Sequence, residues 1–297
     1  MIMGFAAGGD AWLPMLKDLF LSREGTIQGD KDTSLEVLVF DNRGIGESDS
    51  PHEKRRYTTA LMAQDTLAVM DHLGWRKAHV VGHSMGGMIA SRLALAAPER
   101  VASLTLISVT GGGAQSIPLN CKALAAGLRG ALCTSPESRA AVDLSFHYSR
   151  KLLDARDPAS GRRLRELLRE EYIAGGKAGP GQPPHGQAGQ LNAVFTHSLS
   201  KAEQKTLEEA PFPIKYIHGQ HDILAAPRHA ARLASAMSAP MVVLDGAHFI
   251  TRDCAAQIND ELMASIEAAR QGVRNPRTVH PTREPDTYRA GCLCCCA

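Results

Sequence analysis

The sequence predicts an α/β fold built on a mostly parallel, doubly wound sheet. Short apolar runs, rich in β-branched residues, alternate along the chain with segments in which apolar residues recur at helical spacing. Strands that alternate with helices in this way form parallel sheets with helices on both faces. One long block without strand-like runs interrupts the alternation, which indicates an insertion between two parts of the sheet.

The first part of the chain supplies three predicted strands and two predicted helices. Residues 35–40 are apolar and bounded by charge, residues 78–81 form a second apolar run, and residues 101–109 form a third that ends at three glycines. Helices are expected over residues 58–73, which follow a threonine-rich cap region, and over residues 89–97, which stop at a proline.

The block of residues 114–205 is expected to be a helical cap inserted over the sheet. Residues 121–132 and 162–173 have helical spacing, whereas residues 175–184 carry too many glycines and prolines for regular structure. The alternation then returns in the last part of the chain. It is formed by predicted strands at 214–218 and 241–244 and by predicted helices at 227–237 and 251–270.

These elements predict three regions. The core consists of residues 1–113 and 206–270, and the cap of residues 114–205 divides it. Residues 271–297 are polar and contain prolines, so we expect them to be a disordered tail that ends in a cysteine cluster.

Composition restricts the classes of function. With 297 residues, 44% of them hydrophobic, the chain can bury the core of one large domain. Its net charge of +2 gives no reason to expect a nucleic-acid partner. No apolar run is long enough to span a bilayer, and the N-terminus lacks the pattern of a signal peptide. We therefore expect a cytoplasmic protein.

The seven cysteines are unevenly placed. Cys121, Cys133 and Cys254 lie singly and suggest reduced, structural thiols. The other four crowd the C-terminus: Cys292, Cys294, Cys295 and Cys296. Three interpretations compete for this cluster. Lipidation would attach the protein to a membrane, and Cys294, fourth from the end, fits a loose prenylation pattern. A zinc site would need more widely spaced ligands. The third interpretation is an unstructured or mistranslated end.

Residues 82–86 read Gly-His-Ser-Met-Gly and join a predicted strand directly to a predicted helix. In this context the pattern G-x-S-x-G holds the serine on a tight, strained turn with its hydroxyl exposed above the sheet. The flanking glycines are needed because a side chain at either position would clash in so sharp a bend. Ser84 is therefore a candidate nucleophile.

Two further motifs complete a resemblance to the α/β-hydrolases of the serine esterase and lipase type. Asp222 ends the segment Ile-His-Gly-Gln-His-Asp, a strand and turn where this family carries its acid. His248 lies in Gly-Ala-His-Phe after the last strand, where the family carries its base. The order serine, acid, histidine is the family's own. Residues 41–48 (DNRGIGES) match a loop signature of many members, and the resemblance covers residues 1 to about 270.

The resemblance implies a role for each of the three residues. A serine hydroxyl needs a base to take its proton as it attacks, and an imidazole suits that task. A buried carboxylate fixes the tautomer of the imidazole and stabilises the imidazolium that forms. Ser84 is thus expected to attack an ester carbonyl, His248 to shuttle the proton, and Asp222 to orient His248.

The oxyanion that forms on attack needs two backbone donors. The resemblance assigns the amide of Met85, which follows the nucleophile, and the amide of Phe5 in the N-terminal turn. Met3 stands where the family usually has histidine, but the donor at this turn belongs to the main chain. Trp12 and Met88 are candidates for the acyl pocket, with core packing as the competing interpretation.

Other polar residues near these motifs receive structural roles. His83 is expected to pack beside the serine. His218 and His221 would orient the acid loop or lie on the surface. Asp41 and Arg43 would pin their loop beneath the site.

The N-terminus departs from the family pattern. Typical members have two antiparallel strands and most of a third before the oxyanion turn, and the third lies between the strands expected at 35–40 and 78–81. Only Ile2 and Met3 remain to fill that place. An absent central strand would leave unpaired backbone on both neighbours. We hypothesise that the sequence is truncated at its N-terminus and that the first strands are missing.

The leading interpretation is a serine hydrolase, a carboxylic ester hydrolase that acts on a small or lipophilic substrate through an acyl-serine intermediate. No metal or organic cofactor is implied. Epoxide hydrolases and dehalogenases share the fold but use an aspartate as nucleophile, so Ser84 argues against both. Thioester, amide or carbon–carbon cleavage would use the same three residues. The alternatives are a ligand-binding homologue without activity and a membrane-tethered acyl or lipid esterase.

Overall fold

The computed structural model describes residues 1–21, 35–118, 120–175, 181–275 and 278–280. Within them, parallel strands form one sheet in the order β1-β2-β3-β4. The strands are β1 (Ala78–His83), β2 (Val101–Ile107), β3 (Ile214–Gly219) and β4 (Met241–Leu244). The parallel α/β architecture that the sequence predicts is therefore present.

Helices surround this sheet, and in the sequence they precede, separate and follow its strands. The helices before β2 are α1 (Leu13–Leu21), α2 (Thr59–His72) and α3 (Met85–Ala96). The helices between β2 and β3 are α4 (Cys121–Ala131), α5 (Pro136–His147), α6 (Arg150–Asp154), α7 (Leu164–Gly175), α8 (Pro184–Thr196) and α9 (Lys201–Glu208). The last helices are α10 (Pro227–Ala236), α11 (Ile250–Asp253) and α12 (Ala255–Arg270). Short 3₁₀ turns lie at Gly9–Trp12, Lys54–Arg56, Pro98–Arg100 and Gly113–Ser116.

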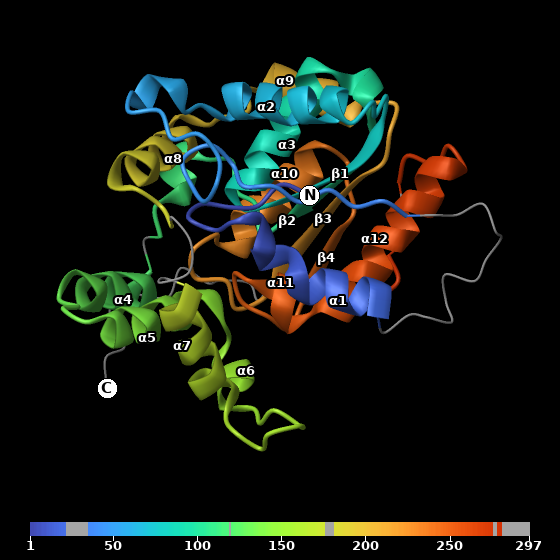
Figure 1. Cartoon of the computed structure of the whole chain (residues 1–297). Coiled ribbons are helices and arrows are strands. Elements are labelled where there is room, and N and C mark those ends of the chain that lie inside the picture. The colour runs from blue at the N-terminus through green and yellow to red at the C-terminus, as the bar shows by residue number, and fades with distance from the viewer. Residues whose placement is uncertain (22–34, 119, 176–180, 276–277, 281–297) are drawn as a thin grey trace.

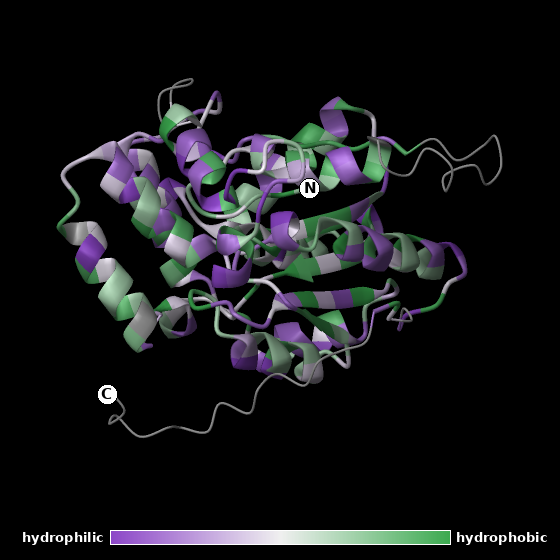
Figure 2. Ribbon diagram, turned by 90° about the horizontal axis from the view of Figure 1, so that it is seen from below, coloured by the Kyte–Doolittle hydropathy of each residue, from purple (hydrophilic) through white to green (hydrophobic). Residues whose placement is uncertain are grey.

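Each face of the sheet is covered by its own set of helices (Figure 1). On one face α2, α3 and α10 pack over side chains such as Tyr216, and on the other α1 and α12 pack over side chains such as Ile217. Successive residues of a strand point to opposite faces, so Tyr216 and Ile217 belong to two separate apolar clusters. Figure 2 shows hydrophobic residues concentrated in the strands and mixed polarity on the surrounding helices.

The strand expected at residues 35–40 is a wrong prediction. Among the described residues of this segment, only Phe40 makes a β-bridge, and its partner is Ile2. Ile2 also bridges Gly82 of β1, so this one residue lies between the two segments. A strand needs a neighbour of comparable length to complete its ladder, and here the neighbour supplies a single bridging residue.

On the N-terminal side of this bridge, Met1 lines a cavity. The ammonium group of Met1 donates to the carbonyl oxygen of Leu38 at 2.7 Å, and burial lowers the pKa of this group to about 5. The cavity beside Met1 has a volume of about 330 Å³, and its wall includes parts of residues 35–38 and of β1.

No strand lies among the described residues between β2 and β3. We call α4 to α8 the inserted helices. In Figure 1, α4 to α7 gather beyond one end of the sheet, and α8 lies nearer to α3. Helix α9 straddles the predicted boundary at residue 205 and contacts α3 and α10.

The predicted tail lies mostly outside the described residues, and so do all four C-terminal cysteines. Within the described part, the amides of Val279 and His280 each donate to Glu261 Oε1 at 2.7 Å, which brings them against α12. None of the helices in the described ranges is both long and apolar enough to cross a membrane.

Candidate active site

Ser84 lies at a sharp turn between β1 and α3. Its backbone has φ 53° and ψ −121°, a conformation that L-residues rarely adopt. The turn requires glycine on both sides of the serine. A Cβ at Gly82 would lie 2.4 Å from the carbonyl oxygen of Gly86. A Cβ at Gly86 would lie 2.0 Å from the carbonyl oxygen of Ile2. The motif at residues 82–86 therefore forms the strained turn that the sequence predicts, with Ile2 packed directly against it.

Ser84, His248 and Asp222 lie in one hydrogen-bonded chain. His248 Nδ1 is 2.8 Å from Asp222 Oδ2, and His248 Nε2 is 3.1 Å from Ser84 Oγ. A carboxylate only accepts, so Nδ1 carries the proton and donates to Asp222. Nε2 is then free to accept the proton of the serine hydroxyl. Each of the three residues follows the carboxyl end of a different parallel strand, which is why residues distant in sequence meet here.

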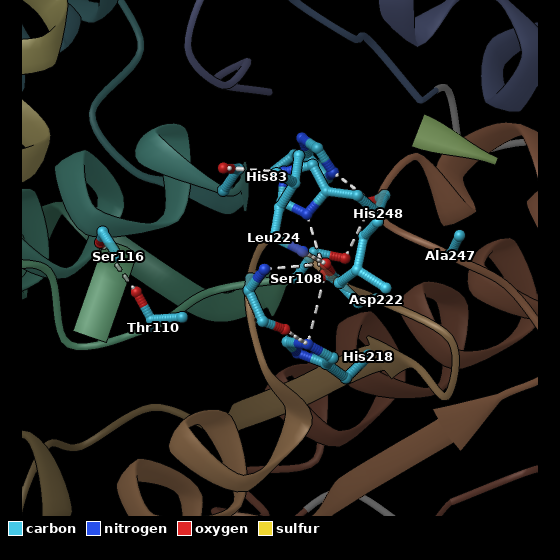
Figure 3. Close-up of polar contacts among 12 residues, drawn as sticks. His83, Ser108, Thr110, Ser116, His218, Asp222, Leu224, Ala247 and His248 are labelled. Carbon is cyan, nitrogen blue, oxygen red and sulfur yellow. Dashed lines mark hydrogen bonds and ion pairs between the residues drawn. The ribbon is translucent and has the colours of Figure 1, made fainter. Parts of the chain in front are cut away.

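The loop after β3 holds Asp222 as a carboxylate. The amides of Leu224 and Ala225 donate to its Oδ1 at 2.9 and 2.8 Å, and His218 Nε2 lies 3.4 Å from its Oδ2 (Figure 3). Burial acts to raise the pKa of Asp222. The nearby charge of His248 and the hydrogen bonds from His218 and His248 outweigh burial, so the pKa lies well below its usual range. Asp222 therefore stays ionised beside the imidazole.

Two further side chains hold the backbone of His248. His83 Nε2 donates to the carbonyl oxygen of His248 at 2.8 Å, and Ser108 Oγ donates to the same oxygen at 3.0 Å. Burial, reinforced by the charge of His248, lowers the pKa of His83 to about 3, so this ring stays neutral. His83 thus packs beside the serine, as predicted, and also fixes the loop that carries His248.

The N-terminal turn lies against Ser84. A Cβ on Gly4 would come within 3.0 Å of the Cβ of Ser84, so this turn approaches the serine as closely as its backbone allows. Asn42 Nδ2 donates to the carbonyl oxygen of Met3 at 2.7 Å and fixes the start of the turn. The amides of Phe5 and Met85 donate to no acceptor among the described residues, so both remain available to a ligand.

A cavity of about 260 Å³ opens over Ser84 and His248. Its lining is mainly apolar and comes from the sheet edge and from the inserted helices: Phe5, Met88, Leu191, Val194, Phe195 and Leu224. Met88, a candidate from the sequence for the acyl pocket, lines this cavity. Trp12 does not, because it is fully buried in the core, edge-on to His83. Its size and apolar character made Trp12 a pocket candidate, but the same properties suit the core.

His147 adds a polar group to this apolar lining. Its Nδ1 is 2.7 Å from the hydroxyl of Tyr172, and the ring packs on Phe249 with centroids 4.5 Å apart. Burial, together with the nearby charge of His248, lowers the pKa of His147 to about 3, so the ring is neutral at physiological pH. Thr110 and Ser116, 3.1 Å apart through their hydroxyl oxygens, also line the cavity.

The remaining residues considered from the sequence lie around this site. His218 is buried and also contacts the carbonyl oxygen of Ala225 at 2.7 Å, whereas His221 is on the surface and pairs with Asp245. Asp41 accepts from the amides of Gly9 and Glu47. Arg43 pairs with Asp65. Ser108 and His147 carried no recognisable signal, because neither lies in a motif and each acts through a tertiary contact.

The comparison with protein families agrees with this geometry. The sequence matches the family model of the alpha/beta hydrolase fold over residues 1–251, and the chain therefore belongs to that family. Among its relatives, a proposed carbamate hydrolase, RutD, from Azorhizobium caulinodans is 36% identical over 105 residues, which are 35% of this chain and 34% of that protein. Epoxide hydrolase 4 of Homo sapiens is 38% identical over 72 residues, 24% of this chain and 20% of that protein. The matched region thus spans about a third or less of each relative.

A solved structure covers far more of the chain. A proposed non-heme bromoperoxidase, BpoC, from Mycobacterium tuberculosis superposes with a TM-score of 0.68 over 90% of this chain and 91% of that one. The two sequences are 23% identical, so this likeness establishes a shared fold.

Proposed function

We propose that this protein is a serine hydrolase that cleaves a carboxylic ester of a small or lipophilic molecule through an acyl-serine intermediate. The observation that carries the proposal is the hydrogen-bonded chain from Asp222 through His248 to Ser84, at the floor of an apolar cavity. Two amides without an acceptor among the described residues support this role: that of Met85, which directly follows Ser84, and that of Phe5, in the turn that approaches Ser84.

In the first half of the reaction, Ser84 Oγ attacks the ester carbonyl carbon while its proton moves to His248 Nε2. The carbonyl oxygen becomes an oxyanion, which accepts hydrogen bonds from the amides of Phe5 and Met85. The imidazolium is stabilised by the carboxylate of Asp222. When the tetrahedral intermediate collapses, the bond to the leaving oxygen breaks, and that oxygen takes the proton from His248 Nε2. An alcohol leaves and the acyl group stays on Ser84.

The second half repeats these steps with water. His248 Nε2 takes a proton from a water molecule, whose oxygen attacks the acyl carbon and forms a second oxyanion in the same place. Collapse breaks the bond to Ser84 Oγ, which regains the proton from His248. The products are a carboxylic acid and the free enzyme. Every step uses side chains and amides of this chain, and the ester and one water molecule are the only reactants consumed.

The cavity supports a short acyl group. Its volume of about 260 Å³ lies just below the range of roughly 300–1,000 Å³ that is usual for small-molecule sites, and its walls are mostly apolar. We further propose that the inserted helices serve as the cap of the core, because they contribute Leu191, Phe195 and His147 to the cavity. His147 is neutral, so the cavity favours an uncharged polar group over a charged one.

The test combines a covalent probe with an ester series. We expect a fluorophosphonate to label the wild type at Ser84 and to leave Ser84→Ala unlabelled. Among p-nitrophenyl esters of increasing chain length, hydrolysis should be fastest with short acyl chains and should disappear in Ser84→Ala. A folded wild type that neither reacts with the probe nor hydrolyses any ester would instead indicate a ligand-binding homologue.

A further inference from the structure

A buried glutamine of α8 reaches out of the inserted helices to the N-terminal turn. Gln190 is completely buried, and its Oε1 accepts from the amide of Ala6 at 3.0 Å. The same oxygen accepts from Gln182 Nε2 at 2.8 Å, while Gln190 Nε2 donates to the carbonyl oxygen of Arg43 at 3.0 Å. One side chain therefore joins three separate segments beside the nucleophile.

The turn that Gln190 contacts is conformationally strained. Ala6 has φ 57°, in the left-handed region that a residue with a Cβ seldom occupies. Such a conformation persists only where the surrounding structure holds it. Asn42 fixes the turn at the carbonyl oxygen of Met3, and Gln190 fixes it at the amide of Ala6. Phe5 lies between these two anchors.

We infer that Gln190 is a positioning residue that holds the Phe5 amide in the direction of the oxyanion. The amide of Ala6 belongs to the peptide unit that follows Phe5, so anchoring it restricts rotation about the Cα–C bond of Phe5, next to the unit that carries the Phe5 amide. An oxyanion donor works only when it is held in advance at hydrogen-bond distance from the developing charge. The inference rests on the proposed function and adds that α8 is coupled to turnover through one side chain.

Helix α8 also supplies a matched control. Asn192 Nδ2 donates to the carbonyl oxygens of Tyr57 at 3.0 Å and Lys54 at 3.3 Å. It therefore anchors the same helix to the core by side-chain hydrogen bonds, and within the described residues none of these bonds reaches the N-terminal turn or the serine. Replacement of Asn192 therefore shows how weaker attachment of α8 alone affects stability and turnover.

The experiment compares Gln190→Met, Gln190→Asn, Gln190→Glu and Asn192→Leu in the full chain. For each variant, kcat and KM for a short p-nitrophenyl ester and the midpoint of thermal unfolding are measured. Met removes the polar end, and Asn keeps it but shortens its reach. We expect both to lower kcat by about 10- to 100-fold with KM changed less than about threefold, because the misplaced donor acts in the transition state. The test needs only one of these two variants, Gln190→Met or Gln190→Asn, to fold.

The other two variants separate positioning from general stability. Glu keeps an oxygen that accepts from Ala6, so we expect kcat within about fivefold of the wild type, which is rescue relative to Met. Asn192→Leu should lower the unfolding midpoint while kcat stays within about threefold of the wild type. The inference is overturned if Gln190→Met and Gln190→Asn turn over like Asn192→Leu. If the wild type shows no Ser84-dependent turnover, the proposed function fails first and the inference fails with it.

Discussion

Replacement of Asp222 by asparagine tests whether the direction of the hydrogen bond to His248 matters. In the protein as it stands, the amides of Leu224 and Ala225 donate to Asp222 Oδ1 at 2.9 and 2.8 Å. In Asp222→Asn the side-chain amide oxygen keeps these two hydrogen bonds. The NH₂ group must then face His248 Nδ1, at the position where the carboxylate oxygen lies 2.8 Å away. Because that group donates, Nδ1 has to accept, and the proton moves to Nε2.

The magnitude follows from this change of tautomer. A protonated Nε2 cannot take the proton of Ser84, and no buried negative charge remains to stabilise an imidazolium. In serine–histidine–aspartate sites this exchange lowers kcat by about 10⁴, which corresponds to about 5.4 kcal/mol of transition-state stabilisation. We therefore expect kcat for a p-nitrophenyl ester to fall by about four orders of magnitude, with KM little changed, in a variant whose circular dichroism matches the wild type.

Asp245→Asn provides the control, because it removes the same charge three positions before His248. Asp245 is partly exposed and pairs with Lys151 and His221, which are both exposed. Its replacement should change kcat by less than about threefold, since exposed ion pairs contribute little. The reasoning is refuted if Asp222→Asn folds normally and retains more than about a tenth of wild-type kcat, or if both variants lose activity equally.

Two further predictions concern stability. Gly86→Ala should lower the free energy of unfolding by about 3 kcal/mol or more, because its Cβ would lie 2.0 Å from the backbone oxygen of Ile2. Gly127→Ala, a helical glycine with open space around it, should leave stability unchanged or raise it by up to about 1 kcal/mol, and equal losses in urea melts would contradict the packing argument. The second prediction concerns acid. Burial lowers the pKa values of His83 and His197 from 6.5 to about 3, so the unfolded chain binds more protons than the folded one between these pH values, and stability falls as pH falls through that window. At pH 5 each of these two residues should lower the free energy of unfolding by about 2 kcal/mol relative to pH 7.5, and His147, whose pKa burial also lowers to about 3, acts in the same direction. Urea melts that show equal stability at both pH values would exclude this effect.

The sequence was most informative where local pattern and tertiary position coincide. Ser84 sits in a five-residue motif between a strand and a helix, and His248 follows the last strand, so both could be located from the chain alone. The segment at residues 35–40 has a strand's composition but lacks a neighbour of matching length, because Ile2 supplies only one bridge. Strand propensity cannot reveal the state of the neighbour.

Residues that act through long-range contacts were the least predictable. Gln190 is one of several polar residues in α8, and its contact with Ala6 spans 184 positions. His147 and Ser108 likewise acquire their places from folding of the inserted helices and the sheet. Trp12 was a candidate for the acyl pocket but lies in the core. A large apolar side chain is compatible with either place, and the sequence alone does not distinguish them.

The most direct test of the proposed function is to trap the covalent intermediate. The wild-type protein is mixed with a short p-nitrophenyl ester, quenched in acid within the first turnover, digested and analysed by mass spectrometry. We predict that the peptide containing Ser84 gains the mass of the acyl group, and that Ser84→Ala gains none. Ester hydrolysis that continues in Ser84→Ala, or an acyl group found only on another residue, would contradict the assignment of Ser84 as the nucleophile.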